Sequence, residues 1–588
     1  MPPGFFQIME TPLPGRFSLR GVLVATGAVL MGLSWLNSLH FLPWVSWHSE
    51  SAAFAAVLVL AWSSFLPSSA GQRANVGELP PAAIPFACLG VAVVIQAALG
   101  LITFWGDALV LLLYLALCIA ALMIGFGWCR NRAQGAYSPT AHIDRQIVQG
   151  VAFTLLMGAV ASALIALVQA LGVWSDVAWI QHTEYTRRPG ANLGQPNQLA
   201  TLLLMGVASL LYFYESRRLS SFTAGIVFVV LGMGLAVTES RTGVLSFLTL
   251  CGWWLVGRNR AGLRMSSWAA LIAAVSLVGL FAAWPTLMSS VDILESGAAV
   301  DTRPGMRLVV WPQLLDALAM RPWSGWGLRE VAKAQNAVAS SYALSEPYTY
   351  CHNILLDLAL GLGVPLALLA TIVTGVWLWR RVSATRSLVP WYCLAALLPL
   401  AVHSMLEFPF AYAYFLVPAM FLIGVLEATT EAQPPFRIGP VPLGAGLLLM
   451  TVLGSWTAVE YLRIEEDFRV ARFEALQVGR TRADYQRPQI VLLSQLDALV
   501  RGARIAPHPG MSAKELELAR KVALHYPWPA TQNRYALSLV LNGNPTEGLR
   551  QIKVLRALHG EKEYREIQEN WQTLAQTKYP TLKKFMPL

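Results

Sequence analysis

The sequence predicts an all-α protein that crosses a membrane many times and ends in a water-exposed helical domain. Of its 588 residues, 55% are hydrophobic and only 13% charged, and the mean hydropathy of +0.51 lies outside the range of ordinary soluble enzymes. Apolar runs of about 17 to 25 residues recur as far as residue 460, and each can cross the hydrocarbon layer as a helix. The composition then becomes charged, which divides the chain into residues 1–460 and 461–588.

About thirteen membrane spans are expected in the first part. They cover residues 20–40, 51–66, 82–104, 107–127, 147–173, 196–214, 221–238, 242–257, 267–287, 352–379, 388–403, 409–427 and 439–460. The first run lacks a convincing cleavage site and is typical of a signal anchor. The six cysteines show neither a disulfide framework nor the spacing of a zinc site, so no metal site is predicted.

Arginines predict the orientation of these spans. Basic residues are retained on the cytoplasmic side during insertion, and the loops after the second, fourth, sixth, eighth and tenth spans carry twelve arginines. They are Arg73, Arg130, Arg132, Arg145, Arg217, Arg218, Arg258, Arg260, Arg264, Arg380, Arg381 and Arg386, with Arg16 and Arg20 before the first span. The amino terminus is therefore expected in the cytoplasm, and the net charge of +10 does not require a nucleic-acid partner.

This orientation places residues 174–195, residues 287–351 and the tail outside, in the periplasm if the source is a bacterium. Several arginines break the charge rule by lying on that side: Arg187, Arg188, Arg241, Arg303, Arg307, Arg321 and Arg329. We interpret them as a sign that an anion binds at the outer face.

Three spans that enter the membrane from outside begin with polar motifs. These are NLGQPN at 192–197, ESRTG at 239–243 and YCHN at 350–353. Helix N-termini carry unpaired N–H groups and about half a positive charge, so three of them beside arginines would suit a phosphate or diphosphate. Their convergence in space is a hypothesis.

Each motif also has a simpler interpretation. A Gln-Pro-Asn run is often only a turn and a helix cap. Arg241 could equally reach lipid phosphates, and a single histidine at an interface often serves only as a hydrogen-bonding residue. The conjunction of the three motifs favours a site.

His352 is the best candidate for a general base. Near a helix N-terminus the dipole disfavours the imidazolium ion, so the ring is expected to stay neutral at pH 7 and to accept a proton. Asp357 follows about one and a half turns deeper, where an ionisable group is costly enough to indicate a function or helix pairing. It ranks below His352.

Motifs between residues 190 and 430 together resemble a known family. Ser240-Arg241-Thr242, GMRLVVWPQLLDALAMRPWSGWGL at 305–328 and His352-Asn353 followed by LALGLGVP are similar to the O-antigen ligase and polymerase superfamily of bacterial membrane glycosyltransferases. LGQPNQLAT at 193–201 and HSMLEFPFAYAYFLVP at 403–418 resemble its protein O-oligosaccharyltransferase branch, the PglL type, which glycosylates pilins and other periplasmic proteins.

The resemblance implies a GT-C-like bundle that transfers a whole oligosaccharide from undecaprenyl diphosphate to a hydroxyl, without a nucleotide sugar, a cofactor or a required metal. It places the family's essential histidine on His352 and its essential glutamine on Gln195. The two arginines that face the diphosphate correspond to Arg241 and Arg307.

One part of the family's pattern is missing. A functional tyrosine is expected in an E-Y-P sequence, but this chain has Glu407-Phe408-Pro409, so that role is absent or has moved to Tyr412 or Tyr414. The residues expected to contact substrate are Asn197, Arg187, Arg188, Arg329, Asn353, Glu407, Tyr412 and Tyr414.

Two segments outside the spans predict further helices. In the connection 287–351, the amphipathic stretch from Arg307 to Met320 suits a helix at the membrane edge that ends at Arg321-Pro322, either as a simple cover or as a lid over the donor. After residue 460, short Ala- and Leu-patterned helices resemble tetratricopeptide-type hairpins. They would dock the acceptor protein or only cap the outer loops.

The predicted function is therefore transfer of an oligosaccharide to Ser or Thr of a pilin-like protein at the outer face of a bacterial inner membrane. Ligation of O-antigen to lipid A core and polymerisation of repeat units are alternatives within the family. A lipid or solute transporter is the alternative outside it, but a transporter would gather polar residues near mid-membrane rather than at one face.

Overall fold

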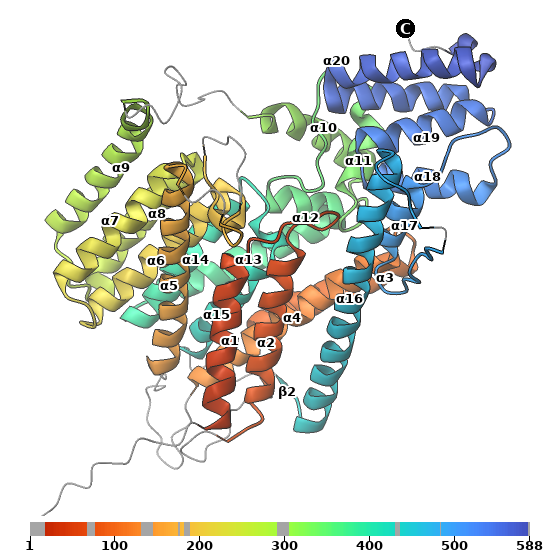
Figure 1. Cartoon of the computed structure of the whole chain (residues 1–588). Coiled ribbons are helices and arrows are strands. Elements are labelled where there is room, and N and C mark those ends of the chain that lie inside the picture. Colours follow the sequence, from red (N-terminus) through yellow and green to blue (C-terminus); the bar gives the residue numbers. More distant parts are fainter. Residues whose placement is uncertain are drawn as a thin grey trace, which may run out of the picture.

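The computed structural model describes residues 18–67, 77–130, 145–173, 177–181, 188–290, 305–429, 436–482 and 484–585 (Figure 1). In these ranges the regular structure is helical apart from one two-residue antiparallel pair, β1 (Glu78–Leu79) with β2 (Phe436–Arg437). The predicted all-α class is confirmed.

The helices before residue 476 form the larger part of the fold. They are α1 (Leu19–Leu36), α2 (Trp47–Ser63), α3 (Ile84–Ala98), α4 (Trp105–Cys129), α5 (Arg145–Ala170), α6 (Pro196–Glu215), α7 (Ser221–Val237), α8 (Arg241–Arg260), α9 (Ser267–Ser290), α10 (Arg307–Met320), α11 (Val331–Ala339), α12 (Ile354–Leu362), α13 (Val364–Ala384), α14 (Leu388–Ser404), α15 (Ala413–Ala428) and α16 (Pro440–Ala475).

Many of these helices can cross a membrane. Among the described residues, eight are long and apolar enough, and α7, α14 and α15 are shorter apolar helices. The eight are α1, α4, α5, α6, α13, α16 and the segments Pro81–Ala98 and Ser267–Met288. The spans predicted at 51–66 and 242–257 coincide with α2 and α8, which are in neither group. The chain is thus a polytopic membrane protein, and thirteen spans stay a prediction.

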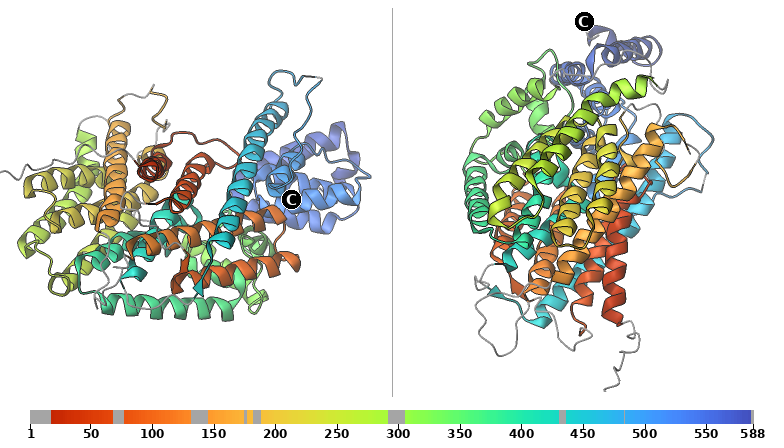
Figure 2. Two further views of the ribbon diagram at one scale, coloured as in Figure 1. Left: turned by 90° about the horizontal axis from the view of Figure 1, so that it is seen from below. Right: turned by 90° about the vertical axis from the view of Figure 1, so that its left-hand side faces the viewer.

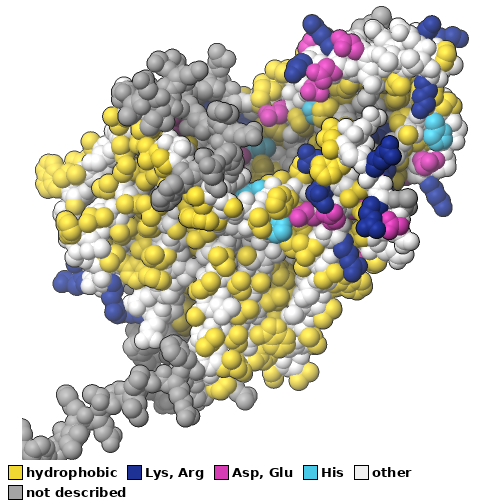
Figure 3. All heavy atoms as spheres, viewed as in Figure 1, with side chains coloured by type: hydrophobic (Ala, Val, Ile, Leu, Met, Phe, Trp, Pro, Cys, Tyr) yellow, Lys and Arg dark blue, Asp and Glu magenta, His cyan; other side chains and the backbone are white. Residues whose placement is uncertain are grey.

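The surface agrees with this assignment. Hydrophobic side chains dominate the face of the helical bundle in Figure 3, while charged side chains of both signs gather over the tail. In the most apolar 18-residue stretch of each helix, the share of residues buried within the protein is only 6% in α13 and 11% in α16, against 78% in α6. The helices α13 and α16 therefore present apolar surface that lipid would cover.

The interior is formed where α4 crosses α15 and α6 packs against α5 and α14. Gly424 of α15 is needed at the first crossing, because a Cβ there would lie 2.2 Å from the carbonyl oxygen of Leu122. Small residues of this kind allow membrane helices to approach closely. Trp35 of α1 is fixed to the same unit by donating its Nε1–H to the Tyr414 carbonyl over 2.9 Å.

The span predicted as a single helix over 352–379 is wrong. The chain forms α12 up to Leu362 and a new helix, α13, from Val364, because Gly363 lies at φ +83°, where an α-helix cannot continue. The turn at Pro322 and Trp323 passes so close that a Cβ on Gly363 would lie 2.2 Å from the Trp323 carbonyl oxygen. His352 consequently lies outside the helices that are long and apolar enough to cross a membrane.

Gly363→Ala is expected to damage folding, because the new methyl group meets backbone and the left-handed conformation is strained for alanine. We expect the apparent Tm of the purified protein to fall by about 5 °C or more. Gly375→Ala in α13 is the control, since a Cβ at Gly375 meets nothing within 4 Å. Equal Tm values for the two variants would contradict this explanation of the break.

The tail consists of α17 (Ser494–Ala503), α18 (Ala513–His525), α19 (Pro529–Leu541) and α20 (Pro545–Thr577), followed by a 3₁₀ turn, η4 (Pro580–Phe585). The sequence predicts helices here at about 491–503, 512–526, 531–543 and 545–560. The helices α17 to α20 lie at these places, except that α20 continues past a kink at Gly560 to Thr577, and the tetratricopeptide likeness stays a prediction. The sequence also predicts a separate helix at 468–477, and this is wrong, because α16 continues without a break from Pro440 to Ala475. Figures 1 and 2 show α16 leading from the bundle to the tail.

The tail is hydrogen-bonded to the connection between α9 and α12. Asn336 of α11 and Gln551 of α20 exchange two side-chain hydrogen bonds of 3.0 and 3.2 Å, and both side chains are buried. The Ser345 N–H donates to the Ala557 carbonyl over 2.8 Å. Because buried amides that satisfy each other hold a specific geometry, the tail and this connection form one unit.

Candidate active site

Two of the three predicted polar helix starts are built as the sequence indicates. Gln195 is the N-cap of α6, and its side-chain oxygen accepts the Gln198 N–H over 2.6 Å, while Pro196 takes the first helical position. Ser240 caps α8 by accepting the Gly243 N–H over 2.9 Å. Arg241, the first residue of α8, is exposed.

The starts of α6 and α8 touch each other. The Ser240 hydroxyl donates to Asn197 Oδ1 over 2.7 Å, which joins the first turn of α6 to the N-cap of α8. Arg188 also reaches this point, donating its Nε–H to the Thr238 carbonyl over 3.0 Å and, at 3.5 Å, an Nη2–H to Asn197 Oδ1. Three residues of the predicted site, Arg188, Asn197 and Arg241, thus lie at one junction.

Glu407, in the turn after α14, connects this junction to the third predicted start. Its Oε1 accepts hydrogen bonds from Arg307, the first residue of α10, and from Asn197 over 3.4 Å. Its Oε2 lies 3.6 Å from His352 Nε2. Residues from α6, α10 and the segment before α12 therefore meet at one carboxylate.

His352 is held in a strained backbone conformation. It lies two residues before α12 at φ +56°, a value uncommon outside glycine, and Asn353 rather than His352 is the N-cap. Asp357 stabilises the bend by accepting the Cys351 N–H over 3.0 Å, and Asn353 donates to the Met405 carbonyl over 3.0 Å. Strain that the surroundings hold in place is typical of functional positions.

The ring of His352 is expected to be neutral, as the sequence predicts, but burial is the main cause. Burial lowers the pKa of His352 to about 4, the bond to the Tyr350 carbonyl offsets this only in part, and the positive charge of Arg307 lowers it further. Burial also raises the pKa of Glu407, whereas the adjacent Arg307 opposes that rise. A neutral imidazole at pH 7 can accept a proton.

Aromatic rings surround the histidine. Tyr348 lies with its ring centroid 4.2 Å from that of His352, and Phe408 meets the imidazole edge-to-face at 4.8 Å. Tyr350 stacks on Phe408 at 4.8 Å, and Arg329 donates a hydrogen bond to its hydroxyl. Tyr348 and Phe408 therefore cover part of the imidazole.

Tyr412 and Tyr414 continue this row of rings beneath Phe408. Tyr412 stacks at 5.9 Å from Phe408 and 5.2 Å from Tyr414. Tyr414 is only 3% exposed and donates its hydroxyl to Gln198 over 2.7 Å. Tyr412 is therefore the nearer of the two to the histidine side of the row.

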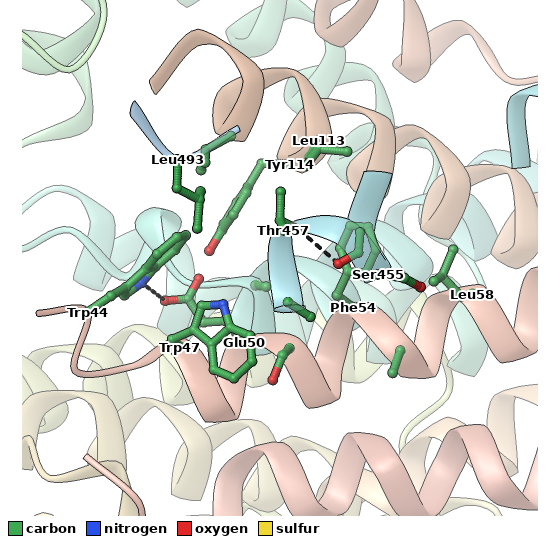
Figure 4. Close-up of a pocket in the computed structure, with 16 residues that line it drawn as sticks. Trp44, Trp47, Glu50, Phe54, Leu58, Leu113, Tyr114, Ser455, Thr457 and Leu493 are labelled. Atoms are coloured by element: carbon green, nitrogen blue, oxygen red, sulfur yellow. Dashed lines mark hydrogen bonds between the residues drawn. The ribbon is translucent and has the colours of Figure 1, made fainter. Parts of the chain in front are cut away.

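Another pocket lies between α2, α4 and α16 (Figure 4). Its walls include Trp44, Trp47 and Tyr114, and Trp44 donates its Nε1–H over 3.1 Å to Glu50, which reaches into it. No lysine or arginine is among its lining residues, so it does not suit a diphosphate.

The junction at Glu407 has the charges that an anionic substrate needs. Arg188, Arg241 and Arg307 lie on the segments that meet there, with the N-terminal N–H groups of α6 and α8. Among the described residues, no group of three or more His, Cys, Asp or Glu side chains is placed to hold a metal ion. The fixed cations can bind a phosphate ester, and the neutral imidazole beside them can accept a proton from a hydroxyl.

The structure brings together most of the residues that the sequence predicts. Asn197, Arg307, His352 and Glu407 meet directly, Arg188 contacts Asn197, and Gln195 and Arg241 occupy the helix starts beside them. Arg329 lies farther from Glu407, with its guanidinium group over the ring of Tyr350. Arg187 and Arg303 lie outside the described residues.

Sequence reasoning did not identify Tyr348, Tyr350 or His403. Tyr348 and Tyr350 precede His352 at spacings of two residues, a pattern that puts side chains of an extended segment on one face. His403 is buried, with Nδ1 2.8 Å from the Thr201 hydroxyl, one turn before Glu407. Its signal was its place in the HSMLEFP motif.

Three family models match separate parts of the chain. Residues 189–214 match one described as protein glycosylation ligase, residues 226–371 one described as O-Antigen ligase, and residues 391–574 one described as virulence factor membrane-bound polymerase, C-terminal. The second match includes His352 and the third includes Glu407.

Two curated proteins of Acinetobacter baylyi are similar to the chain. One, named general O-oligosaccharyltransferase, is 27% identical over 567 residues that cover 93% of this chain and 94% of the relative. The other, named ComP-specific O-oligosaccharyltransferase, is 28% identical over 341 residues, 57% of this chain and 59% of the relative. The similarity to the first therefore extends into the tail.

Proposed function

We infer that the chain is an oligosaccharyltransferase of the O-antigen ligase superfamily, which transfers a preassembled oligosaccharide en bloc to proteins. The family matches and the two relatives support this, and the meeting of Arg307, His352 and Asn197 at Glu407 is the observation in the fold that carries it. A site for an anion beside a neutral base is what transfer from a lipid diphosphate to a hydroxyl requires.

The donor that we propose is an oligosaccharide on undecaprenyl diphosphate, and the acceptor is a Ser or Thr hydroxyl of a pilin-like periplasmic protein. The enzyme would lie in a bacterial inner membrane with its amino terminus in the cytoplasm and its site and tail in the periplasm. The distribution of arginines in the sequence supports this orientation.

In the mechanism that we propose, Arg241 and Arg307 bind the diphosphate. Guanidinium groups suit this role because they stay charged and match phosphate oxygens with paired N–H donors. Negative charge that develops on the leaving diphosphate is stabilised by these arginines and by the N–H groups at the helix starts, and no metal is needed.

His352 accepts the proton of the acceptor hydroxyl while the hydroxyl oxygen attacks the sugar carbon. The bond from that carbon to the diphosphate breaks. A single displacement inverts the configuration at the sugar. Gln195 would hydrogen-bond to the sugar or phosphate, together with Asn197, Asn353 and the aromatic side chains beside His352.

Reconstitution of the purified enzyme tests this proposal. Incubated with lipid-linked oligosaccharide, it is expected to glycosylate pilin, detected as an intact O-linked glycan by mass spectrometry, and equally well after EDTA treatment. Lipid A core serves as the competing acceptor. Sugar on lipid A core alone would indicate an O-antigen ligase, longer lipid-linked chains would indicate a polymerase, and sugar on neither acceptor would favour transport. Loss of activity with EDTA and its return with a divalent ion would contradict the role of the arginines.

A further inference from the structure

Arg307 already has a partner in this structure, although the proposed function, on which this inference rests, assigns it to the donor diphosphate. Arg307 and Glu407 form an ion pair whose side chains are 29% and 13% exposed. The diphosphate and Glu407 therefore compete for the same guanidinium group. A diphosphate carries more negative charge than one carboxylate, so it is expected to displace Glu407 from Arg307.

The Nε2 atom of His352 receives no hydrogen bond from Glu407. Its Nδ1 lies 3.1 Å from the Tyr350 carbonyl oxygen, which can only accept, so the ring proton is on Nδ1 and Nε2 bears the lone pair. Nε2 lies 3.6 Å from Glu407 Oε2, and an ionised carboxylate has no hydrogen to donate to it. The contact becomes an ionic hydrogen bond only when Nε2 gains a proton.

We propose that Glu407 is a positioning residue that holds Arg307 while the site is empty and pairs with protonated His352 after the diphosphate has taken Arg307. Binding of the donor then releases from Arg307 a largely buried carboxylate beside the base. The acceptor hydroxyl loses its proton to Nε2, its oxygen bonds to the sugar carbon, and the diphosphate leaves with the electron pair of the broken bond. The imidazolium is then held by the Tyr350 carbonyl on one side and Glu407 on the other.

The surroundings of His352 support this exchange. The charged groups facing it are Arg307 from α10 and Glu407 from the turn after α14, while Tyr348, Tyr350 and Phe408 contribute rings. The charge of Arg307 contributes to the low pKa of His352 in the empty site. Moving Arg307 onto a diphosphate and leaving Glu407 in place makes the imidazole a stronger base when the donor is bound.

The first test measures binding of undecaprenyl diphosphate, without sugar, to the full-length protein in detergent. Glu407→Gln is expected to bind it roughly three- to tenfold more tightly than the unchanged protein, because Arg307 no longer has to leave a carboxylate. Glu466→Gln, which removes the carboxylate of an exposed ion pair with Arg469, is the control and should bind like the unchanged protein.

Equal or weaker binding by Glu407→Gln would overturn the exchange of partners and leave the proposed function standing. If neither protein bound undecaprenyl diphosphate, the proposed function would fail, and this inference with it.

The second test is the pH dependence of kcat. A carboxylate beside the imidazolium raises the pKa of the base, and activity is lost below that pKa, so removing the carboxylate moves the acidic limb to lower pH. In Glu407→Gln we expect this limb to move down by about one pH unit, with kcat reduced roughly 10- to 100-fold. Glu407→Asp should recover part of both changes. A lower kcat with an unmoved acidic limb would show a merely structural role and refute the pairing with His352.

Discussion

Replacing His352 by Asn is expected to abolish oligosaccharide transfer while the protein still folds. Asparagine tolerates the left-handed conformation at φ +56° better than most residues, so the bend before α12 should persist. Loss of a general base lowers kcat by about 10²- to 10⁴-fold. Single-turnover transfer from lipid-linked oligosaccharide to pilin measures this loss, and His352→Ala should show the same loss of activity.

His508→Asn is the matched control, since His508 is exposed in the tail and its ring hydrogen-bonds to the carbonyl of the adjacent Pro509. It should transfer sugar at the normal rate. Near-normal activity in His352→Asn, with an unchanged Tm, would remove His352 from the chemistry.

Arg307→Ala is expected to have the second large effect. It removes a cation from the proposed diphosphate site and leaves Glu407 without its charged partner. We expect kcat/KM to fall by about 10²- to 10³-fold and undecaprenyl diphosphate to bind more weakly. Arg307→Lys should lose less, because it keeps the charge but not the paired donors.

Arg469→Ala controls for the loss of an arginine from an ion pair, because Arg469 pairs with Glu466 at an exposed position on α16. Its kcat/KM should stay within about twofold of normal, given the small contribution of exposed pairs. If Arg307→Ala bound undecaprenyl diphosphate as tightly as this control, Arg307 would have no part in holding the donor.

Local sequence rules were sufficient to predict the helix starts in the site. The sequence predicts polar helix starts at 192–197 and 239–243 and a helix end at Arg321-Pro322. The structure agrees in all three cases, since α6 begins at Pro196, α8 begins at Arg241 and α10 ends at Met320. Such signals depend on a few neighbouring residues, so one sequence is enough to read them.

The features that were missed depend on contacts between distant segments. Gly363 breaks the span predicted over 352–379 because the Trp323 backbone passes beside it, and an apolar run shows no trace of that approach. Glu407 was expected only to contact substrate, whereas its position between Arg307 and His352 requires α10 and α14 to be placed in space first. The neutrality of His352 was predicted from a helix dipole, but burial by surrounding residues is the larger cause.

The hydrogen bonds between the tail and α11 set the limits within which relatives could exchange parts. Asn336 and Ser345, which meet Gln551 and Ala557 of α20, belong to the same connection that begins with Arg307 and leads to His352. In a hybrid joined only at residue 476, the foreign tail would lack the partners of Asn336 and Ser345. The loss of these hydrogen bonds would disturb the connection that positions Arg307 and His352. An exchange of tails between relatives that keeps these hydrogen bonds therefore has to carry residues 307–351 together with the tail, and these residues include Arg307 and lead directly to His352.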